Sequence, residues 1–525
     1  MSIKKIKSFY KSITTNYLLK RFFAASGKEI GNGKKILIYA GIGHMYISYF
    51  EILMYHLLKR EGYEVDYLIY DEHIRSNEVI TKEVIQKSGK IKFWNRSVKN
   101  AVSLLKRAKV DFEFIDAKDK DIAAEIETLG GNLDNIFAFE KDGIRIGEMV
   151  KGTMYRYYKS LTFDDDALQV GKDFLHTALV NYYEIAKRTG AKKYDYVLFS
   201  HGIYVTWEPV MEYCKKENID FISYDRAKTK NTVNINFNQV APDWSFDQAW
   251  ERFSDRRLTS EEERLVEKYL KDRELQSNDV YSYNFSEREN DIRELKTMLK
   301  IPLDTRVITV FTNLIWDAAN VARDLAFESA FECLTHTIEH YKNREDVHVV
   351  LRAHPAEKVL GTKERYGDLL RQYYGNDFPQ NVTIIDPEMA INSFSVIDIS
   401  DIGVVNTSTI GLEFALSGKP VLLISETHYR NKGFTFDVNS RKEYFSVMED
   451  LLMNPKLKDS QIDLARKYFF IMMFKYQHKT PLLYENGVFR RYSYGTLNKA
   501  AEDPVLKNML ARIREGKNID FVNWE

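Results

Sequence analysis

Residue types that mark specialised classes of protein are scarce in this chain. Among its 525 residues there are two cysteines, Cys214 and Cys333, whose separation fits neither a disulfide framework nor a zinc-ligand motif. Lysine plus arginine and aspartate plus glutamate both number 76, so no overall positive charge favours nucleic acid as a partner. These absences indicate an ordinary globular protein of a reducing compartment, without a nucleic-acid partner.

Long apolar runs are also missing. Because no run reaches about 18 apolar residues, we expect no transmembrane helix, and the N-terminus lacks the apolar centre of a signal peptide. The N-terminus is basic and aromatic instead, with residues such as Lys4, Phe9 and Lys11. Such a segment can contact an anionic membrane surface or pack on the protein through its aromatic side chains. We expect a cytoplasmic protein, and peripheral membrane contact through residues 1–26 is one interpretation.

The order of apolar runs predicts two successive α/β domains. Residues 35–40 form a short apolar run that ends in a glycine turn, and residues 46–60 and 64–70 have the periodicities of a helix and a second strand. The same order restarts after Pro302 with an apolar run over residues 306–311. Strands that alternate with helices are typical of parallel sheets, so we expect an α/β fold with two Rossmann-like domains facing a cleft.

Changes in composition suggest the domain boundaries. Residues 255–295 are rich in charge and poor in strand pattern, which predicts helices between the two domains. The expected parts are a basic amphipathic N-terminal segment (1–30), an N-terminal Rossmann-like domain (31–250), a helical linker (251–300), a C-terminal Rossmann-like domain (301–455) and C-terminal helices (456–525).

Polar loops follow the predicted strands of the second domain, where ligands of open α/β sheets bind. The strongest is Asn406-Thr-Ser-Thr-Ile-Gly-Leu-Glu413, in which small hydroxyl residues lead from a strand end into a helix. Free backbone N–H groups at a helix N-terminus attract anions, and Ser408 and Thr409 can add hydroxyl donors. Glu413 can accept from ribose hydroxyls one turn later. The alternative is a simple N-cap by Thr407 or Ser408.

A second loop follows the predicted strand over residues 347–352. Arg352 and His354, in the sequence Arg-Ala-His-Pro, offer a forked donor and a ring N–H to a phosphate. The alternative is a structural loop histidine. This histidine precedes the Ser408 loop within the same predicted α/β domain, which favours a binding role.

Two further loops complete the predicted binding edge. Arg430 and Lys432 follow the predicted strand over residues 419–424 and add positive charge. Trp316 can stack on a sugar or base, and Asp317 can act as a base or accept from sugar hydroxyls. A solvated loop is the alternative for the first pair, and an N-cap role is the alternative for Asp317.

The first domain offers histidines at predicted strand ends. Gly41-Ile-Gly-His44 lacks the third glycine of a dinucleotide fingerprint, so it is a weak signal for NAD. Either His44 or His201 can deprotonate an acceptor hydroxyl, because the pKa of histidine lies near working pH. Each can equally be a structural loop residue. The acidic triplet Asp164-Asp-Asp166 has no apolar strand before it, which favours a helix start over a metal-binding motif.

The motifs together resemble capsule polysaccharide biosynthesis proteins of the GT-B glycosyltransferase superfamily. The resemblance lies in Asn313-Leu-Ile-Trp-Asp317, Arg352-Ala-His-Pro355, Thr407-Ser-Thr-Ile-Gly-Leu-Glu413, His428-Tyr-Arg-Asn-Lys-Gly-Phe434 and Ser200-His-Gly-Ile-Tyr-Val-Thr-Trp207. It implies a GT-B-like fold with the donor in the C-terminal domain. In related His-Pro enzymes that use CMP-Kdo or CMP-sialic acid, the matching residues hold the nucleotide phosphate, and Glu413 resembles the ribose-binding acid. Such enzymes usually need no bound metal, so we expect no metal site and no cofactor.

The expected activity is transfer of a sugar from a nucleotide-sugar to a surface glycan or glycolipid. The expected donor-binding residues are Trp316, Arg352, His354, Ser408, Thr409, Glu413, Arg430 and Lys432, and the candidate bases are His44, His201 and Asp317. The alternatives are a CDP-polyol phosphotransferase, a sugar-nucleotide epimerase and a non-catalytic capsule assembly protein, because fold alone does not fix function.

Overall fold

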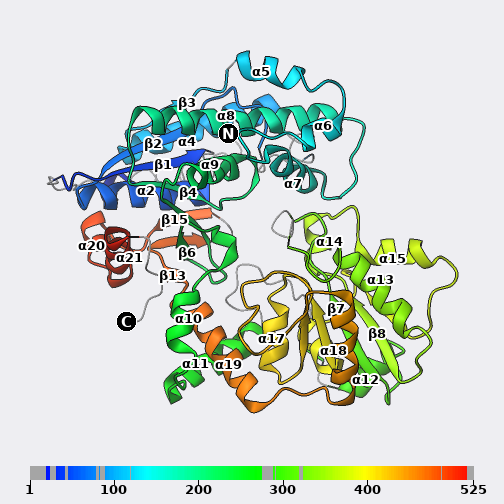
Figure 1. Cartoon of the computed structure of the whole chain (residues 1–525). Coiled ribbons are helices and arrows are strands. Elements are labelled where there is room, and N and C mark those ends of the chain that lie inside the picture. The colour runs from blue at the N-terminus through cyan, green and yellow to red at the C-terminus, as the bar shows by residue number, and fades with distance from the viewer. Residues whose placement is uncertain are drawn as a thin grey trace, which may run out of the picture. The chain divides into compact units, whose positions relative to one another are not determined.

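The computed structural model describes residues 19–23, 31–41, 45–77, 82, 89–118, 120–274, 288–289, 291–317, 323–485 and 488–516. Their contacts divide the chain into two compact units. Unit 1 holds the described residues up to 157, residues 163–248 and those from 475 onward, and unit 2 holds residues 158–162 and 249–474. Each unit has its own largely parallel sheet (Figure 1). The two Rossmann-like units predicted from the sequence are therefore present.

Unit 1 is built on a seven-stranded sheet. Its strands are β1 (Lys35–Gly41), β2 (Glu64–Tyr70), β3 (Glu113–Ile115), β4 (Tyr196–Ser200), β5 (Phe221–Arg226), β6 (Thr232–Phe237) and β13 (His478–Lys479), in the spatial order β13-β6-β5-β4-β1-β2-β3. β1 to β5 are parallel, whereas β6 pairs antiparallel with both of its neighbours. Because β2 and β4 flank β1, the chain reverses its direction across the sheet between β1 and β4.

The helices of unit 1 pack on this sheet or on one another. They are α2 (Met45–Arg60), α4 (Lys90–Ala108), α5 (Lys120–Glu127), α6 (Leu133–Phe137), α7 (Ile146–Tyr158), α8 (Ala167–Ala191), α9 (Tyr204–Lys216), α20 (Leu497–Ala501) and α21 (Pro504–Glu515). A buried polar contact joins α8 to the sheet: the hydroxyls of Tyr39 and Tyr70 donate to Oδ1 of Asn181 at 2.7 and 2.9 Å. The Asn181 amide in turn donates to the carbonyl of Val205 in α9 at 2.7 Å, so no partner in this contact is left unsatisfied.

Unit 2 has a six-stranded, fully parallel sheet. Its strands are β7 (Arg306–Phe311), β8 (Val347–Arg352), β9 (Val382–Ile385), β10 (Ile402–Val405), β11 (Val421–Leu423) and β12 (Phe436–Asp437), in the order β12-β11-β10-β7-β8-β9. The strands read as continuous apolar runs because helices cover both faces. Those helices are α10 (Asp247–Phe253), α11 (Ser260–Glu274), α12 (Ile292–Met298), α13 (Ala330–Tyr341), α14 (Ala356–Leu360), α15 (Tyr366–Tyr374), α16 (Ser393–Ile399), α17 (Ile410–Leu416), α18 (Arg441–Met453) and α19 (Asp459–Phe470).

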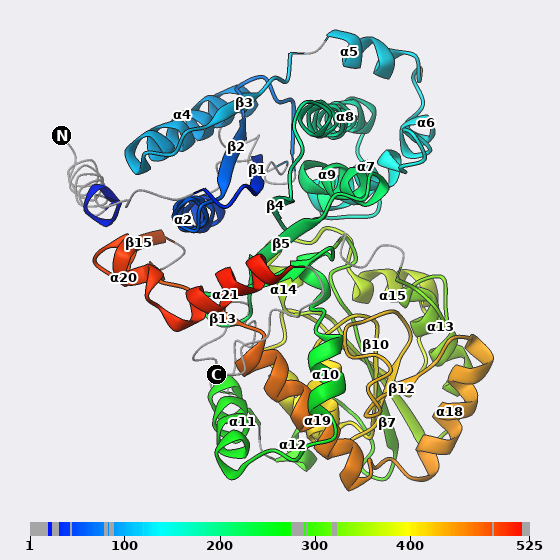
Figure 2. The ribbon, with the colours of Figure 1, turned by 60° about the vertical axis from the view of Figure 1, so that its left-hand side comes forward.

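The C-terminal tail, expected to be helical, is divided between the two units and also contains strands. α19 and the following π-helical turn (Ile471–Lys475) are buried in unit 2, whereas β13 completes the unit 1 sheet. β14 (Leu482–Glu485) and β15 (Val488–Tyr492) form a hairpin that contacts α2 (Figures 1 and 2). Phe489 stacks on Tyr49, with ring centroids 3.6 Å apart. The tail therefore adds β13 to the unit 1 sheet by pairing with β6, and its hairpin packs on α2 through aromatic side chains.

The described helices contain no membrane span. None of them is long and apolar enough to cross a bilayer. The charged segment expected to be a helical linker forms α10, α11 and α12, and it lies almost wholly within unit 2. Residues 275–287, within the expected linker, lie outside the described residues.

Candidate functional site

The loops that carry the predicted donor-binding residues meet at the carboxyl edge of the unit 2 sheet. They follow β7, β8, β10 and β11, and these strands are parallel. Because β8 and β10 flank β7, the chain reverses across the sheet between β7 and β10. There the Nδ2 of Asn313 donates to the hydroxyl oxygen of Thr407, which ties the loop after β7 to the loop after β10. Ligands of open α/β sheets bind at such a reversal.

His354, after β8, is held as a neutral ring. Its Nδ1 accepts the backbone N–H of Ala356 at 3.1 Å, which assigns the proton of the neutral ring to Nε2. Burial, followed by the positive charge of Arg352, lowers the pKa of His354 to about 4. At neutral pH the ring is therefore an uncharged hydrogen-bond donor, which suits a phosphate oxygen.

The side chain of Arg352 points into the protein. This corrects the expectation that its guanidinium group binds a phosphate. The side chain is 3% exposed, and it donates to the carbonyl of Asp386 at 3.4 Å and to that of Ile391 at 2.9 Å. Burial lowers the pKa of Arg352 to about 10, although the guanidinium remains charged at neutral pH. Arg352 thus fixes the loop after β9 beside the His354 loop.

Ser408 and Thr409 lead from β10 into α17, as the sequence predicts. Thr409 takes the N-cap position without a side-chain cap bond, and Oγ of Ser408 lies 3.4 Å from the backbone N of Ile410. Both residues are half-buried, so part of each side chain is accessible at the sheet edge. The pair remains the predicted phosphate-binding part of this loop.

The path of this loop depends on a glycine and a tyrosine. A Cβ at Gly411 would lie 2.5 Å from the hydroxyl of Tyr429, and that hydroxyl donates to the carbonyl of Ser408. Only glycine allows so close an approach. Glu413, one turn further, is 4% exposed and its Oε1 is fully covered. A ligand at the surface does not reach that oxygen, and contact of a ribose with the other carboxylate oxygen of Glu413 stays a prediction.

Arg430 is also structural, contrary to the expected phosphate contact. It is 5% exposed, and its guanidinium donates to the carbonyls of Leu423 at 3.2 Å and Val438 at 3.1 Å and to Oδ1 of Asn439 at 2.9 Å. These bonds tie the ends of β11 and β12 together. Lys432 is half-buried in the same loop, so its phosphate contact stays a prediction.

The loop after β7 gives one correction and one open prediction. Trp316 is 4% exposed and its Nε1 donates to Oγ1 of Thr362 at 2.8 Å. The ring is therefore a core side chain, and the expected stacking on a sugar is corrected. Asp317 is half-buried, and its backbone N donates to the carbonyl of Leu314 at 3.1 Å. Residues 318–322 lie outside the described residues, so the choice between an N-cap and a base stays a prediction.

His201 occupies the matching edge of the unit 1 sheet. It follows β4 at the reversal between β1 and β4, and its Nδ1 lies 3.0 Å from Oδ1 of Asp225 near the end of β5. This is an ion-pair distance, although the atoms lack the alignment of a straight hydrogen bond. The two side chains are 29% and 19% exposed, so the pair is accessible. His44, the other candidate in this unit, lies outside the described residues.

The backbone of His201 is strained and firmly held. Its φ is +59°, a left-handed conformation that costs a non-glycine residue on the order of 1–3 kcal/mol. Its backbone N donates to the carbonyl of Tyr224 at 2.9 Å, and its carbonyl accepts from the N of Ala241 at 3.1 Å. Strain that the surroundings maintain in this way is often found at functional positions.

Sequence reasoning missed Asp225 and a second acid, Glu357. Asp225 is at a strand end that the periodicity could identify, but its pairing with His201 depends on the neighbouring strand. Glu357 begins α14 directly after His-Pro and looks like an ordinary helix-start acid. It is 0% exposed, neither carboxyl oxygen has a partner among the described residues, and burial raises the pKa of Glu357 to about 8.

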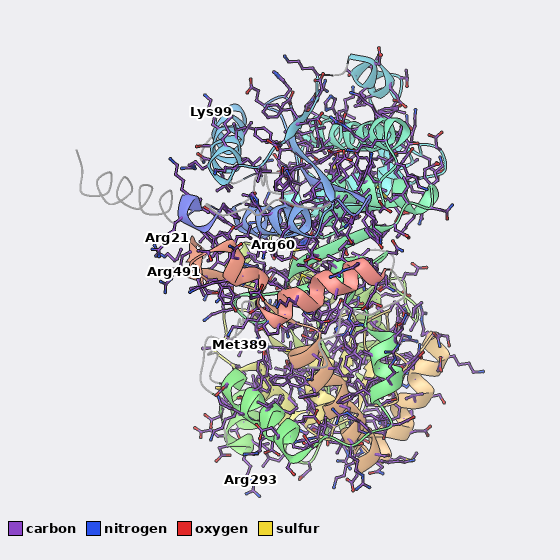
Figure 3. The ribbon with its side chains drawn as sticks, turned by 90° about the vertical axis from the view of Figure 1, so that its left-hand side faces the viewer. Arg21, Arg60, Lys99, Arg293, Met389 and Arg491 are labelled. Atoms are coloured by element: carbon purple, nitrogen blue, oxygen red, sulfur yellow. The ribbon has the colours of Figure 1, made fainter. Side chains whose placement is uncertain are left out.

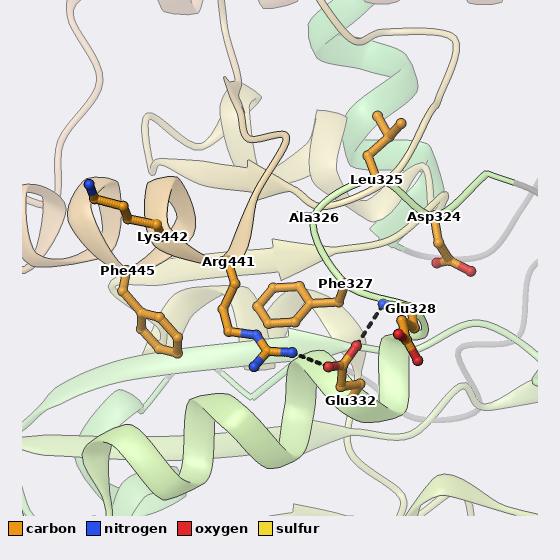
Figure 4. Close-up of a pocket in the computed structure, with 9 residues that line it drawn as sticks. All are labelled: Asp324, Leu325, Ala326, Phe327, Glu328, Glu332, Arg441, Lys442 and Phe445. Carbon is orange, nitrogen blue, oxygen red and sulfur yellow. Dashed lines mark hydrogen bonds and ion pairs between the residues drawn. The ribbon is translucent and has the colours of Figure 1, made fainter.

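A cavity of about 1060 Å³ lies near the binding edge but contains none of the candidate residues (Figure 4). Arg441 at the start of α18 forms an ion pair with Glu332 of α13 across it. Asp324, on its rim, lies 3.4 Å from Nδ2 of Asn406 and 3.4 Å from Oγ of Ser425. The cavity therefore neighbours the β10 loop through Asp324, while the candidate donor residues lie at the sheet edge itself.

The acidic triplet forms a helix start, as predicted. Asp166 occupies the N-cap position of α8, and Lys82 lies 2.5 Å from Asp164 and 3.4 Å from Asp166. Within the described ranges, no group of three or more His, Cys, Asp or Glu side chains is placed to hold a metal ion. Cys214 and Cys333 are buried free thiols, in agreement with the absence of a disulfide framework.

The family comparison agrees with the resemblance of the motifs. Residues 264–460 match a family described as capsule polysaccharide biosynthesis protein. Two solved chains from Thermosulfurimonas dismutans, titled KpsC beta Kdo 2,4 transferase and beta Kdo 2,7 transferase, are 11% and 15% identical. They cover 59% and 62% of this chain and 87% and 89% of their own length, with TM-scores of 0.35 and 0.34. A UDP-GlcNAc 2-epimerase from Neisseria meningitidis is 12% identical, covers 84% of this chain and 99% of its own, and has a TM-score of 0.26. No curated protein matches significantly.

Proposed function

We propose that this chain is a glycosyltransferase, because residues 264–460 match the model of the capsule polysaccharide biosynthesis protein family. It transfers a sugar from a nucleotide-sugar donor to a capsular or surface polysaccharide or a glycolipid. The donor binds at the carboxyl edge of the unit 2 sheet, and unit 1 receives the acceptor.

The observation that carries this proposal is the neutral His354 at the same sheet edge as the Ser408 loop. A donor site for a nucleotide phosphate needs hydrogen-bond donors at the place where negative charge develops. His354 supplies an Nε2–H from the loop after β8, and Ser408 and Thr409 supply hydroxyls from the loop after β10, on the other side of β7. The buried side chains of Arg352, Arg430 and Tyr429 donate hydrogen bonds to the backbone of the loops at this edge, so the phosphate-binding groups are positioned before the substrate arrives.

In this reaction one bond forms, one bond breaks and one proton is transferred. The acceptor oxygen attacks the anomeric carbon, the bond from that carbon to the phosphate oxygen breaks, and the nucleotide leaves with the bonding electron pair. His354, Ser408 and Thr409 donate to the leaving phosphate oxygens and so stabilise the charge that develops there. The reaction uses no resident cofactor or metal in this proposal.

Of the candidate bases, we assign His201, because its Nδ1 lies 3.0 Å from the carboxylate of Asp225. With Nδ1 turned toward Asp225, the neutral ring leaves Nε2 unprotonated to accept the acceptor's hydroxyl proton. Asp225 positions the ring and stabilises the imidazolium that forms, as a carboxylate does in other histidine pairs. Asp225 is thus a positioning residue.

We further propose that the protein works in the cytoplasm at the inner face of the cell membrane. A glycolipid acceptor would be presented there. The basic and aromatic residues 1–26 are suited to contact an anionic surface, and most of them lie outside the described residues.

A thermal-shift panel of CMP, CDP, UMP, UDP, GDP and ADP tests the proposal. A ligand that binds only the folded state adds about 2.7 kcal/mol of stability at roughly a hundredfold excess over Kd. We expect one nucleotide class to raise the melting temperature of the wild type and to lose most of that effect in His354→Ala. Failure of every nucleotide to bind would refute the donor site. Product analysis then separates the alternatives, since a phosphodiester in the product identifies polyol-phosphate transfer and donor conversion without acceptor identifies an epimerase.

A further inference from the structure

One side of unit 1 combines several elements that are far apart in the sequence. Phe22, in the helical turn over residues 19–22, stacks on Tyr492 of β15 with ring centroids 4.0 Å apart. Phe23 stacks on His56 of α2 at 4.3 Å, and Nε2 of His56 lies 2.7 Å from the carbonyl of Ala108 at the end of α4. These contacts join the turn, α2, α4 and β15 in one layer (Figure 2).

The outer surface of this layer is cationic. Every charged residue of α4 is lysine or arginine. The exposed cations of the layer are Lys20, Arg21, Arg60, Lys99, Lys106, Lys109 and Arg491, and Figure 3 shows Arg21, Arg60, Lys99 and Arg491 on this side of unit 1. We call these seven residues the cationic face. Because the whole chain has zero net charge, this is a local excess and not a general property of the surface.

Acids at the margin of this face already have cationic partners. Glu61 lies 3.1 Å from Arg514, and Glu502 lies 2.6 Å from Lys507. Asp111 lies 3.8 Å from Lys59. These acids are therefore drawn toward other cations, and the field above the cationic face keeps its positive sign.

We propose that the cationic face docks unit 1 on the surface of an anionic lipid bilayer. Lys and Arg side chains beside a negatively charged leaflet each raise the affinity roughly fivefold, and several together act without inserting into the bilayer. Phe22, Phe23 and Tyr492 are buried beneath the face, so these rings are not available to stack on nucleic-acid bases. The chain that precedes the turn is also rich in lysine, which extends the same chemistry in sequence.

The biological role of this docking rests on the proposed function, because a glycolipid acceptor lies in the membrane and unit 1 is the proposed acceptor unit. The interaction itself is independent of any substrate. It also differs from contact through residues 1–26 alone, because five of the seven cations, Arg60, Lys99, Lys106, Lys109 and Arg491, lie outside that segment.

Vesicle flotation tests the proposal with the full-length protein. The probes are phosphatidylcholine vesicles with and without phosphatidylglycerol. The test variant combines Lys99→Gln, Lys106→Gln and Arg491→Gln, and the matched control combines Arg293→Gln, Lys300→Gln and Lys456→Gln, which removes three exposed cations of unit 2. We expect the wild type to bind only the anionic vesicles, the test variant to lose on the order of a hundredfold in affinity, and the control to stay within about twofold. Added salt should weaken binding.

Several outcomes would overturn the proposal. They are absence of binding to anionic vesicles, equal loss in both variants, and unchanged binding in the test variant, which would assign the contact to residues 1–26 alone. Preferential binding to soluble dextran sulfate would identify a polyanionic glycan as the partner. The nucleotide thermal shift of the test variant should match the wild type. If no nucleotide shifts any of the proteins while vesicle binding persists, the proposed function fails and the docking surface stands.

Discussion

The two sheet edges of this protein use histidine in opposite ways. At the unit 2 edge, His354 is half-buried, and desolvation lowers its pKa to about 4, so the ring is neutral at neutral pH and can donate from Nε2. At the unit 1 edge, His201 is partly exposed and lies 3.0 Å from the carboxylate of Asp225. A neighbouring carboxylate favours the protonated ring, whereas desolvation disfavours it.

Under the proposed function, this difference adapts a similar sheet reversal to two steps of one reaction. A donor to phosphate should not change its charge when the nucleotide leaves, and His354 meets that need. A base must accept a proton and hold it, and a carboxylate partner helps His201 to do so. The loops at the two edges are also held in place differently. Buried arginines donate hydrogen bonds to backbone carbonyls of the unit 2 loops, whereas backbone hydrogen bonds hold His201.

Replacement of His201 should produce the largest change in turnover. General base catalysis contributes about 10²–10⁴-fold, so His201→Ala should lower kcat by that order while nucleotide affinity stays unchanged. Asp225→Asn should lower kcat less, with the pH profile of kcat altered as well. Nucleotide release in the presence of acceptor measures kcat, and the thermal shift measures affinity. Normal turnover in His201→Ala would move the base to His44 or Asp317.

Replacement of His354 should affect binding and turnover together. By analogy with oxyanion donors, loss of its N–H should cost about 2.7–4 kcal/mol of transition-state stabilisation, or roughly 10²–10³ in rate. Unlike His201→Ala, this variant should also weaken nucleotide binding. If the two histidine variants gave the same pattern of kcat and affinity, the proposed division of roles between the edges would be wrong.

Glu357 should make the stability of unit 2 sensitive to pH. Burial raises its pKa from 4.5 to about 8, so the folded state retains a proton that the unfolded state has lost. This group therefore favours folding fully below pH 4.5, and its contribution falls by about 1 kcal/mol per pH unit as the pH rises toward 8. Glu357→Gln should remove that loss, so the stability of the variant relative to wild type should rise between pH 5 and pH 8. Denaturant titrations at a series of pH values would show it, and a constant difference would contradict a protonated Glu357.

The smallest expected change concerns the shape of the Ser408 loop. Gly411→Ala places a methyl group 2.5 Å from the Tyr429 hydroxyl and should cost about 1–3 kcal/mol, the usual range for overpacking. Tyr429→Phe in the same chain should recover part of that loss. Gly131→Ala is the matched control, since a Cβ there meets nothing within 4 Å. Thermal melts with and without nucleotide separate the effect on folding from the effect on binding.

Much of the fold was predictable because each apolar run is short, continuous and bounded by turns. β2, β7 and β8 have the predicted limits, since parallel strands that are covered on both faces carry a strong apolar signal. β6, β13 and the β14–β15 hairpin were missed. Their residues alternate or are few, and their pairing depends on strands that lie far away in the sequence.

The candidate site was predictable in position more than in residue roles. Polar loops after strands located the edge, and His354, Ser408 and Thr409 lie there. Trp316, Arg352, Glu413 and Arg430 have the right residue types in the right loops, yet the structure turns them inward. A sequence pattern gives the position of a residue along the chain, but the direction of a long side chain depends on which carbonyls and cavities its neighbours provide.

By itself, the sequence determined two α/β units, the strand ends that carry the polar motifs, and a resemblance to capsule biosynthesis proteins. These follow from local periodicity and from residue order, which need no distant contact. The tertiary structure alone decided that His201 faces Asp225, that Glu357 is sealed without a partner, and that α4, β15 and residues 19–22 form one cationic face. Each of these joins residues from separate segments, and such contacts exist only once long-range packing has brought the segments together.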